Sequence, residues 1–304
     1  MKWRKLGLVF CPSGSEEWMS SHAAGPIANH LEGDYFKVYF SPRDAKKRSQ
    51  IASLVLRMYD EKASVVEGSI EHVLSHGENG CFDDCGCTIT SAVKDGKRHI
   101  LYYVGWSLAI TIPFRNAIGA AVSENGSGRF ERVSLAPIFD RSMVDPISLG
   151  SCSVLKEYDK YRMWYGSCIS WKGHTVKDYN VQIKYAESKD GFTWNPFNKI
   201  VLVSKYPEED KIGKPHVIYE NNYYKMWYSY KKGRYFRMGY AESENGMKWE
   251  RMDEKVGIDV SDSGWDSEMI EYPFIFDHKR QRYMLYNGNE YGKTGFGLAV
   301  LEKP

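Results

Sequence analysis

The sequence lacks long apolar runs and has almost no net charge. Its 304 residues hold 41 Lys and Arg against 39 Asp and Glu, a net charge of +2, and no apolar run approaches the roughly 18 residues typical of a membrane-spanning helix. A protein with so small a net charge has only a weak electrostatic field, which favours neither nucleic acid nor a membrane surface as a partner. The start, MKWRKLGLVFCPSGSEEW, has only a short apolar run, so we expect a strand rather than a signal peptide and a cytoplasmic location.

Cysteine is also scarce, with six residues at positions 11, 81, 85, 87, 152 and 168. Their spacing is not typical of a zinc site, and the cluster at 81–87 has no histidine nearby. Buried free thiols of a cytoplasmic protein are the better interpretation. We therefore expect no metal and no other cofactor.

Helical periodicity is nearly absent, whereas aromatic residues are abundant, with 22 Tyr and 9 Trp. Five apolar segments end in an aromatic residue followed by a small or polar one, at 34–41, 98–105, 160–167, 223–230 and 282–289. The residues that align in them are Phe40, Tyr103, Tyr165, Tyr228 and Tyr286, which recur every 58 to 63 positions. This repeat predicts an all-β fold, in which only 49–61 reads equally well as a strand or a short helix.

Each repeat contains further strands around the aromatic one. An apolar segment such as 152–158 precedes it, and a third and a fourth strand follow, with Asp-Gly or Asn-Gly turns as in 181–191 and 236–246. Four antiparallel strands per repeat describe a propeller blade, so we predict a single five-bladed β-propeller domain over residues 1–304. The last repeat ends after its third strand, 295–302, and the N-terminal strand 5–10 is expected to close that blade.

Two turns, SKDGFTW (188–194) and SENGMKW (243–249), are similar to the Asp-box of sialidases but lack one spacer residue. Such turns are structural and lie far from active sites. We assign them no chemistry.

The predicted propeller brings distant residues together at one end of its axis. The segments just before the innermost strands become neighbours there, namely 18–22, 82–84, 151–153, 214–216 and 265–273. Carboxylates that face each other across such a mouth suit glycoside chemistry, in which one protonates the leaving oxygen and the other activates water or attacks the anomeric carbon. Asp84 and Glu271 are our candidates for this catalytic pair; alternatively, they cap turns or pair with arginines.

Other polar and aromatic residues near the same mouth are candidates for binding a substrate. Histidines suit sugar hydroxyls, arginines favour a carboxylate or phosphate on the ligand, and aromatic rings stack on sugar faces. These candidates are His22, Arg43, Asp83, Trp106, Arg115, Lys214, His216, Glu268 and Tyr272. Two alternatives stay open: the arginines pair with acids between blades, or two His and two carboxylates form a metal site.

The repeats and turns together resemble the five-bladed propellers of the arabinanase, xylosidase, invertase and levansucrase superfamily (glycoside hydrolase families 43, 62, 32 and 68). The resemblance covers the whole chain blade by blade, and WMSSHAAGP (18–26) and SPRD (41–44) are similar to motifs of invertases. More narrowly, the SHA, PRD, FDD-x-G, PFRN-x-IG, MWY and GWD-x-E-x-x-x-YP segments are similar to glycosidase-like propellers encoded among bacterial polysaccharide-biosynthesis genes.

The resemblance implies roles for only some of the candidates. Asp84 is similar in placement to the second-blade acid of the superfamily, but the first-blade Asp is replaced here by Ser21 and His22, and Glu271 has no matching residue. We therefore expect a carbohydrate-active enzyme of surface-polysaccharide synthesis that binds a sugar or sugar nucleotide, with an anionic group on the ligand. The alternatives are a non-catalytic glycan-binding propeller and a metal-dependent lyase or isomerase.

Overall fold

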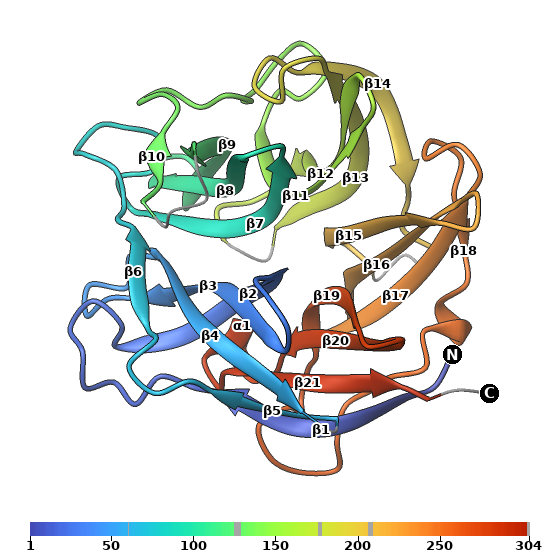
Figure 1. The fold of residues 1–304 in the computed structure, drawn as a ribbon. Coiled ribbons are helices and arrows are strands. Elements are labelled where there is room, and N and C mark those ends of the chain that lie inside the picture. The colour runs from blue at the N-terminus through green and yellow to red at the C-terminus, as the bar shows by residue number, and fades with distance from the viewer. Residues whose placement is uncertain (60, 125–128, 176–177, 206–208, 303–304) are drawn as a thin grey trace.

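The computed structural model describes residues 1–59, 61–124, 129–175, 178–205 and 209–302. In this part of the chain, 21 strands form five antiparallel sheets around a central axis, which confirms the predicted five-bladed β-propeller (Figure 1). Two short helical turns, η1 (Asp253–Lys255) and α1 (Asn289–Gly292), lie between strands. Within the described ranges, no helix has the length and apolar character needed to cross a membrane.

The sheets follow one another along the chain, each starting at the axis. Blade 1 contains β2 (Ser21–His30), β3 (Tyr35–Arg43), β4 (Ile51–Tyr59) and β5 (Lys62–Val65), with β6 (Glu71–Leu74) also paired to β4. Blade 2 contains β7 (Gly86–Asp95), β8 (Arg98–Leu108), β9 (Phe114–Ser123) and β10 (Glu131–Arg132). Blade 3 contains β11 (Ser148–Glu157), β12 (Lys160–Trp171), β13 (Tyr179–Ser188) and β14 (Asn195–Leu202). Blade 4 contains β15 (Ile212–Glu220), β16 (Tyr223–Lys232), β17 (Tyr235–Ser243) and β18 (Glu250–Arg251).

Blade 5 is built from both ends of the chain. It contains β19 (Glu271–His278), β20 (Gln281–Asn287), β21 (Phe296–Leu301) and, outermost, β1 (Trp3–Phe10). The pairing of β1 with β21 confirms the predicted closure of the ring (Figure 1). The ambiguous segment 49–61 contributes strand β4. All six cysteines are free thiols: Cys87, Cys152 and Cys168 are buried, whereas Cys11 is exposed, contrary to the expectation of burial.

The aligned tyrosines of blades 2 to 5 each lie against an aspartate that also pairs with a cation, and this aspartate is buried in blades 2, 3 and 5 and partly buried in blade 4. In blade 3, Tyr165 donates to Asp145 over 2.9 Å, and the Lys184 ammonium lies 3.1 Å from the same carboxylate. The other three sets are Tyr103, Asp83 and Arg132; Tyr228, Asp253 and Arg251; and Tyr286, Asp266 and Lys5. A buried carboxylate is tolerated only with such partners. Blade 1 has Phe40 at this position, and that ring is completely buried.

A side-chain oxygen links each blade to the innermost strand of the next. In every case it accepts a hydrogen bond of 2.8–3.0 Å from a backbone N–H across the junction. The five pairs are Ser41 with Ile89, Ser91 with Val154, Ser153 with Val217, Ser229 with Tyr272, and Asn287 with Gly25. Four of these oxygens belong to serines and the fifth to an asparagine, so the ring is closed by polar as well as apolar contacts.

The two turns similar to Asp-boxes also connect neighbouring blades. In the first turn, Asp190 accepts from the backbone N–H groups of Phe192 and Thr193. Tyr102 of blade 2 donates to the Gly191 carbonyl over 3.1 Å. In the second, Trp164 of blade 3 donates to the Gly246 carbonyl over 2.6 Å. Both turns therefore receive an aromatic donor from the preceding blade.

Lys214 spans the axis from blade 4 to blade 2. Its Nζ donates to the carbonyls of Thr90 over 2.8 Å and Ile89 over 3.4 Å, and it passes within 3.6 Å of the site where a side chain on Gly25 would begin. Burial lowers the pKa of this ammonium from 10.5 to about 7. The side chain thus connects three blades at the centre of the ring.

We expect Asp145→Ala to destabilise the fold by about 3–5 kcal/mol, because it leaves the buried Lys184 ammonium without its carboxylate. The substitution also removes the acceptor of Tyr165 and Ser167. The free energy of unfolding in urea measures the effect. Glu131→Ala is the control, since this side chain is 75% exposed and should change the free energy by less than about 0.5 kcal/mol. Equal losses in the two variants would contradict the role of Asp145.

We expect Lys214→Met to alter how stability depends on pH. The folded chain releases the Lys214 proton near pH 7, whereas an unfolded lysine keeps it to about pH 10. Between these limits the unfolded state binds more protons than the folded state, so the stability of the wild type rises with pH. Below pH 7 the lysine is charged in the folded state, and the full cost of burying that charge lowers the stability. Urea unfolding of both proteins across this range should show the wild type gaining stability relative to the variant as pH rises. Parallel curves would contradict the assignment.

Candidate functional site

Every innermost strand is irregular near its mouth end. The pairing register shifts between Ser21 and Ala24, Ile89 and Ser91, Leu149 and Cys152, Gly213 and His216, and Glu271 and Phe274. Such irregularities turn side chains out of the regular alternation. Three non-glycine residues here have a positive φ: His22 at 61°, Lys214 at 47° and Tyr272 at 58°. Backbone strain of this kind, about 1–3 kcal/mol per residue, tends to collect at functional sites.

Glu271 is the most unusual group at the mouth. It is the first residue of β19, its side chain is completely buried, and neither carboxylate oxygen has a hydrogen-bond partner among the described residues. Burial raises its pKa well above the ordinary value of 4.5, and the nearby Tyr272 opposes this rise only in part. The carboxyl group is therefore predisposed to keep its proton at neutral pH and to act as a general acid.

Three tyrosines from different elements lie within electrostatic range of this carboxyl group. Tyr272 follows it in β19, Tyr179 begins β13 of blade 3, and Tyr291 lies in α1. Burial raises the pKa of all three phenols, and the charge of Glu271 adds to each shift. The phenols stay protonated and supply hydroxyl groups to the site. Neither Tyr179 nor Tyr291 was among the residues predicted from sequence.

Two of the candidates from the sequence, His22 and Arg43, lie in blade 1. His22 Nδ1 lies 2.9 Å from Ser21 Oγ, and burial followed by the charges of Arg43 and Lys293 lowers its pKa to about 4, so the ring is neutral at pH 7. The Arg43 guanidinium is half-buried and has no ion pair or hydrogen bond to any residue that the structure describes. Its charge also lowers the pKa of Tyr272 and Tyr291, which places it on the same side of the mouth.

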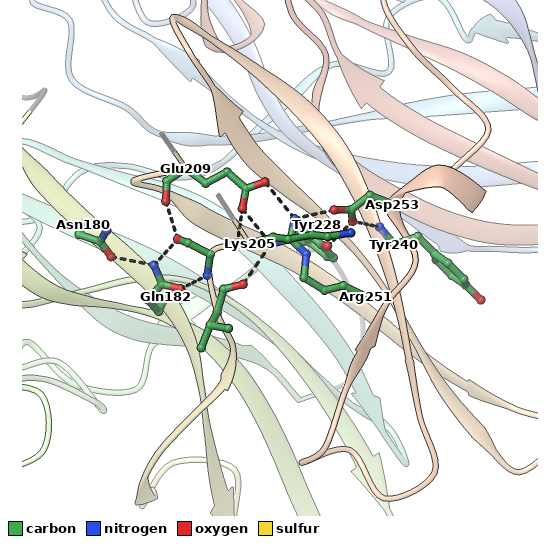
Figure 2. Close-up of polar contacts among 10 residues, drawn as sticks. Asn180, Gln182, Lys205, Glu209, Tyr228, Tyr240, Arg251 and Asp253 are labelled. Carbon is green, nitrogen blue, oxygen red and sulfur yellow. Dashed lines mark hydrogen bonds and ion pairs between the residues drawn. The ribbon is translucent and has the colours of Figure 1, made fainter. Parts of the chain in front are cut away.

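Blades 3 and 4 contribute Asp210, on a segment held by a buried polar network. The Glu209 carboxylate is 1% exposed and accepts from Arg251 over 2.8 Å and 3.2 Å and from the Lys205 N–H over 2.7 Å (Figure 2). Arg251 also pairs with Asp253. Asp210 was not predicted because the start of the fourth innermost strand was expected near Lys214, whereas β15 begins at Ile212.

Several residues predicted from the sequence have no described contact with Glu271, Arg43 or Asp210. Asp83 is part of the buried set in blade 2, paired with Arg132 over 2.8 Å. Asp84 accepts from the Gly80 N–H over 3.1 Å and lines a shallow hollow with Ser107 and residues 135–137 at the rim of blade 2. Among the described residues no contact joins Asp84 to Glu271, so their predicted facing arrangement remains a prediction.

The remaining predicted residues are spread around the mouth. Trp106 donates to Ser49 over 2.9 Å, Arg115 is exposed at the start of β9, and Glu268 is exposed, with described contacts through its backbone. His216 Nε2 lies 3.1 Å from the Ile275 carbonyl, and burial lowers its pKa to about 3. Across the described ranges, no three His, Cys, Asp or Glu side chains are arranged to hold a metal ion.

Solved structures share the fold over nearly the whole chain. A glycoside hydrolase covers 99% of this chain and 92% of its own length, with 16% identity and a TM-score of 0.76. A glycosyl hydrolase from Bacteroides ovatus covers 99% and 90%, with 15% identity and a TM-score of 0.72. A structure from the GH130 family of mannoside phosphorylases covers 99% and 98%, with 14% identity and a TM-score of 0.71. Identities this low establish the propeller fold alone.

Sequence comparison gives a closer relationship. No protein-family model matches the chain. Two proteins of Mycobacterium tuberculosis match it over 302 residues at 43% identity, covering 99% of this chain and all of their own length. They are "Uncharacterized protein Rv1502" of strain ATCC 25618 / H37Rv and "Uncharacterized protein MT1551" of strain CDC 1551 / Oshkosh. The chain is therefore a five-bladed β-propeller that belongs to the same family as these two mycobacterial proteins.

Proposed function

We propose that the chain is a carbohydrate-active enzyme that hydrolyses or transfers a glycosyl unit, with Glu271 as its proton donor. The observation that carries this proposal is the fully buried carboxyl group of Glu271 at the mouth of the axis, which has no hydrogen-bond partner among the described residues. A buried carboxylic acid that is kept neutral is what the leaving oxygen of a glycoside requires. The fold shared with glycoside hydrolases is consistent with this chemistry.

The surrounding groups suit a sugar ligand. The hydroxyl groups of Tyr179, Tyr272 and Tyr291 can donate to or accept from sugar hydroxyls, and the neutral His22 ring can accept from one. As the glycosidic bond breaks, Glu271 gives its proton to the departing oxygen, while a second carboxylate takes the proton of the attacking water or sugar hydroxyl. The sequence suggested Asp84 as the other member of this pair.

The ligand in this proposal carries a negative charge. Arg43 supports this, because a half-buried guanidinium with no partner among the described residues is well matched to a carboxylate or phosphate. A uronic acid or a sugar nucleotide would provide such a group. The resemblance to propellers of polysaccharide-biosynthesis genes extends the proposal to a cytoplasmic step in making a bacterial surface glycan.

A non-catalytic glycan-binding propeller is the second candidate. It is favoured by Ser21 and His22, which stand where the resemblance would place a first-blade Asp. Such a protein would bind sugars with no turnover, and Glu271 would then only shape the pocket. The two candidates differ in whether the wild-type chain cleaves any glycoside.

We expect Glu271→Gln to lower kcat for 4-nitrophenyl glycosides by about 10²–10⁴-fold while sugar binding is retained, because the amide has no proton to donate. The wild-type rate should fall on the alkaline side as Glu271 ionises, at a pH well above 4.5, and this limb should be absent in the variant. Initial rates across pH and calorimetric binding measure the two effects. Wild-type rates in the variant would contradict the role of Glu271.

We expect Arg43→Met to raise KM for a 4-nitrophenyl uronide by at least about 10-fold, the effect of losing roughly one charge-assisted hydrogen bond. KM for the corresponding neutral hexoside should change much less. Arg129→Met is a matched control, since this side chain is 88% exposed. Equal changes for the charged and the neutral sugar would argue against an anionic ligand at Arg43.

A further inference from the structure

We propose that Asp210, rather than Asp84, is the carboxylate that works opposite Glu271, and that Tyr179 and Tyr291 form the wall of the glycosyl-binding site between them. This inference rests on the proposed function and names the second catalytic group of the same site. It follows from how the structure holds the two acidic segments and from the charged and polar neighbours of each carboxylate.

One strand holds both acidic segments. The Ser229 hydroxyl of β16 accepts from the N–H of Tyr272, the residue after Glu271. Two residues further along β16, the Lys231 N–H donates over 2.9 Å to the carbonyl of Lys211, the residue after Asp210. Because both segments bond to the mouth end of β16, Glu271 and Asp210 lie on neighbouring segments of the same rim.

The environment of Asp210 differs from that of Glu271 in the way an acid–base pair requires. Its Oδ2 lies 3.1 Å from the Lys211 ammonium and 3.2 Å from that of Lys231, whereas Glu271 has no described cationic partner. Two ammonium groups therefore face the same oxygen of Asp210. The other oxygen, Oδ1, is buried and has no partner among the described residues, so it is free to receive a proton.

Two tyrosines are close enough to both carboxylates to respond to their charges. After burial, the charges of both acids raise the pKa of Tyr179 and of Tyr291, so each phenol lies within electrostatic range of both carboxylates. Tyr179 stacks on Trp171 with ring centroids 4.7 Å apart, and the Lys211 ammonium lies 4.3 Å from the centre of the Tyr179 ring. Phenols near both carboxylates suit a sugar ring bound between an acid and a base.

Asp84 lacks these relationships, although its Oδ1 is also buried without a partner among the described residues. Its described contacts are in its own loop, where Oδ2 accepts from the Gly80 N–H. Burial raises the pKa of the neighbouring Cys85 thiol, and the Asp84 carboxylate adds to that rise. The hollow that Asp84 lines is bounded by the rim of blade 2, including Phe82 and Leu108, and contains none of the three tyrosines.

The reaction balances with these two groups. Asp210 Oδ1 takes a proton from water or an acceptor hydroxyl, whose oxygen bonds to the anomeric carbon. The bond from that carbon to the leaving oxygen breaks with its electron pair, and Glu271 supplies the proton that this oxygen needs. Proton exchange with solvent then returns Asp210 to its carboxylate form and Glu271 to its protonated form.

The test compares Asp210→Asn, Asp84→Asn and Glu271→Gln on 4-nitrophenyl and 2,4-dinitrophenyl glycosides of the same sugar, after urea unfolding has confirmed that each variant is folded. A dinitrophenolate leaves without protonation, so Glu271→Gln should recover on that substrate. Asp210→Asn should be slower than wild type by about 10²–10⁴-fold on both substrates, because the base is needed in each case. Asp84→Asn should stay at least about 10-fold faster than Asp210→Asn on both, because the Asp84 carboxylate takes no proton in this scheme.

The outcomes separate the two proposals. A slow Asp84→Asn beside a near-normal Asp210→Asn would overturn the assignment of Asp210 and leave the proposed function standing. Failure of Glu271→Gln to recover on the dinitrophenyl substrate would overturn the role of Glu271 as acid. A wild-type chain without turnover on any of these glycosides would overturn both. Azide that restores turnover to Asp210→Ala would support the assignment, since a purely structural carboxylate would not be replaced in this way.

Discussion

The structure depends on a hydrogen bond at each of its five blade junctions, and four of these bonds are buried while the one at Tyr272 is partly buried. An oxygen of Ser41, Ser91, Ser153, Ser229 or Asn287 accepts from the backbone of the next innermost strand, which fixes the height of each blade relative to its neighbour. A buried N–H without an acceptor costs about 1–3 kcal/mol, so a blade that slid along the axis would lose this bond at both of its junctions. The mouth is therefore assembled from five strands of defined register, and two of these junctions support the candidate site directly: Ser229 holds the segment of Glu271, and Asn287 holds blade 1.

The fold could be predicted because its signal is repeated five times. The aromatic residue that aligns between blades sits in the second strand, where strand packing and the aspartate beneath it require a large ring with a hydroxyl group. Phe40 is the exception: in blade 1 a buried ring occupies the same position but has no hydroxyl group. Residues that pack in the same way in every blade can be recognised in the sequence because the same pattern occurs five times. The closure of blade 5 followed from counting the strands in each repeat.

The site could be predicted only in part, because its residues occur once. Glu271, Tyr272, His22 and Arg43 could be named as candidates from the sequence because they stand close to strand ends that the repeat had located. Asp210 was not among the candidates because the sequence placed the start of this strand near Lys214, two residues beyond Ile212, where β15 begins. Asp83 was a candidate for binding substrate, but its carboxylate is buried and pairs with Arg132. The sequence alone does not show whether an acid beside a strand start faces the mouth or is turned inward to an arginine.

The closure of blade 5 has a consequence for synthesis on the ribosome. Strand β1 is made first, but its partner β21 follows only after the other four blades, so the nascent strand waits with an unpaired edge that offers a template for aggregation. Arg4 and Lys5 place charge along that edge, a feature that discourages association with a second chain. Once the ring closes, Arg4 pairs with Glu61 and Lys5 with Asp266, so the charges that protect the newly made strand become the ion pairs that retain it.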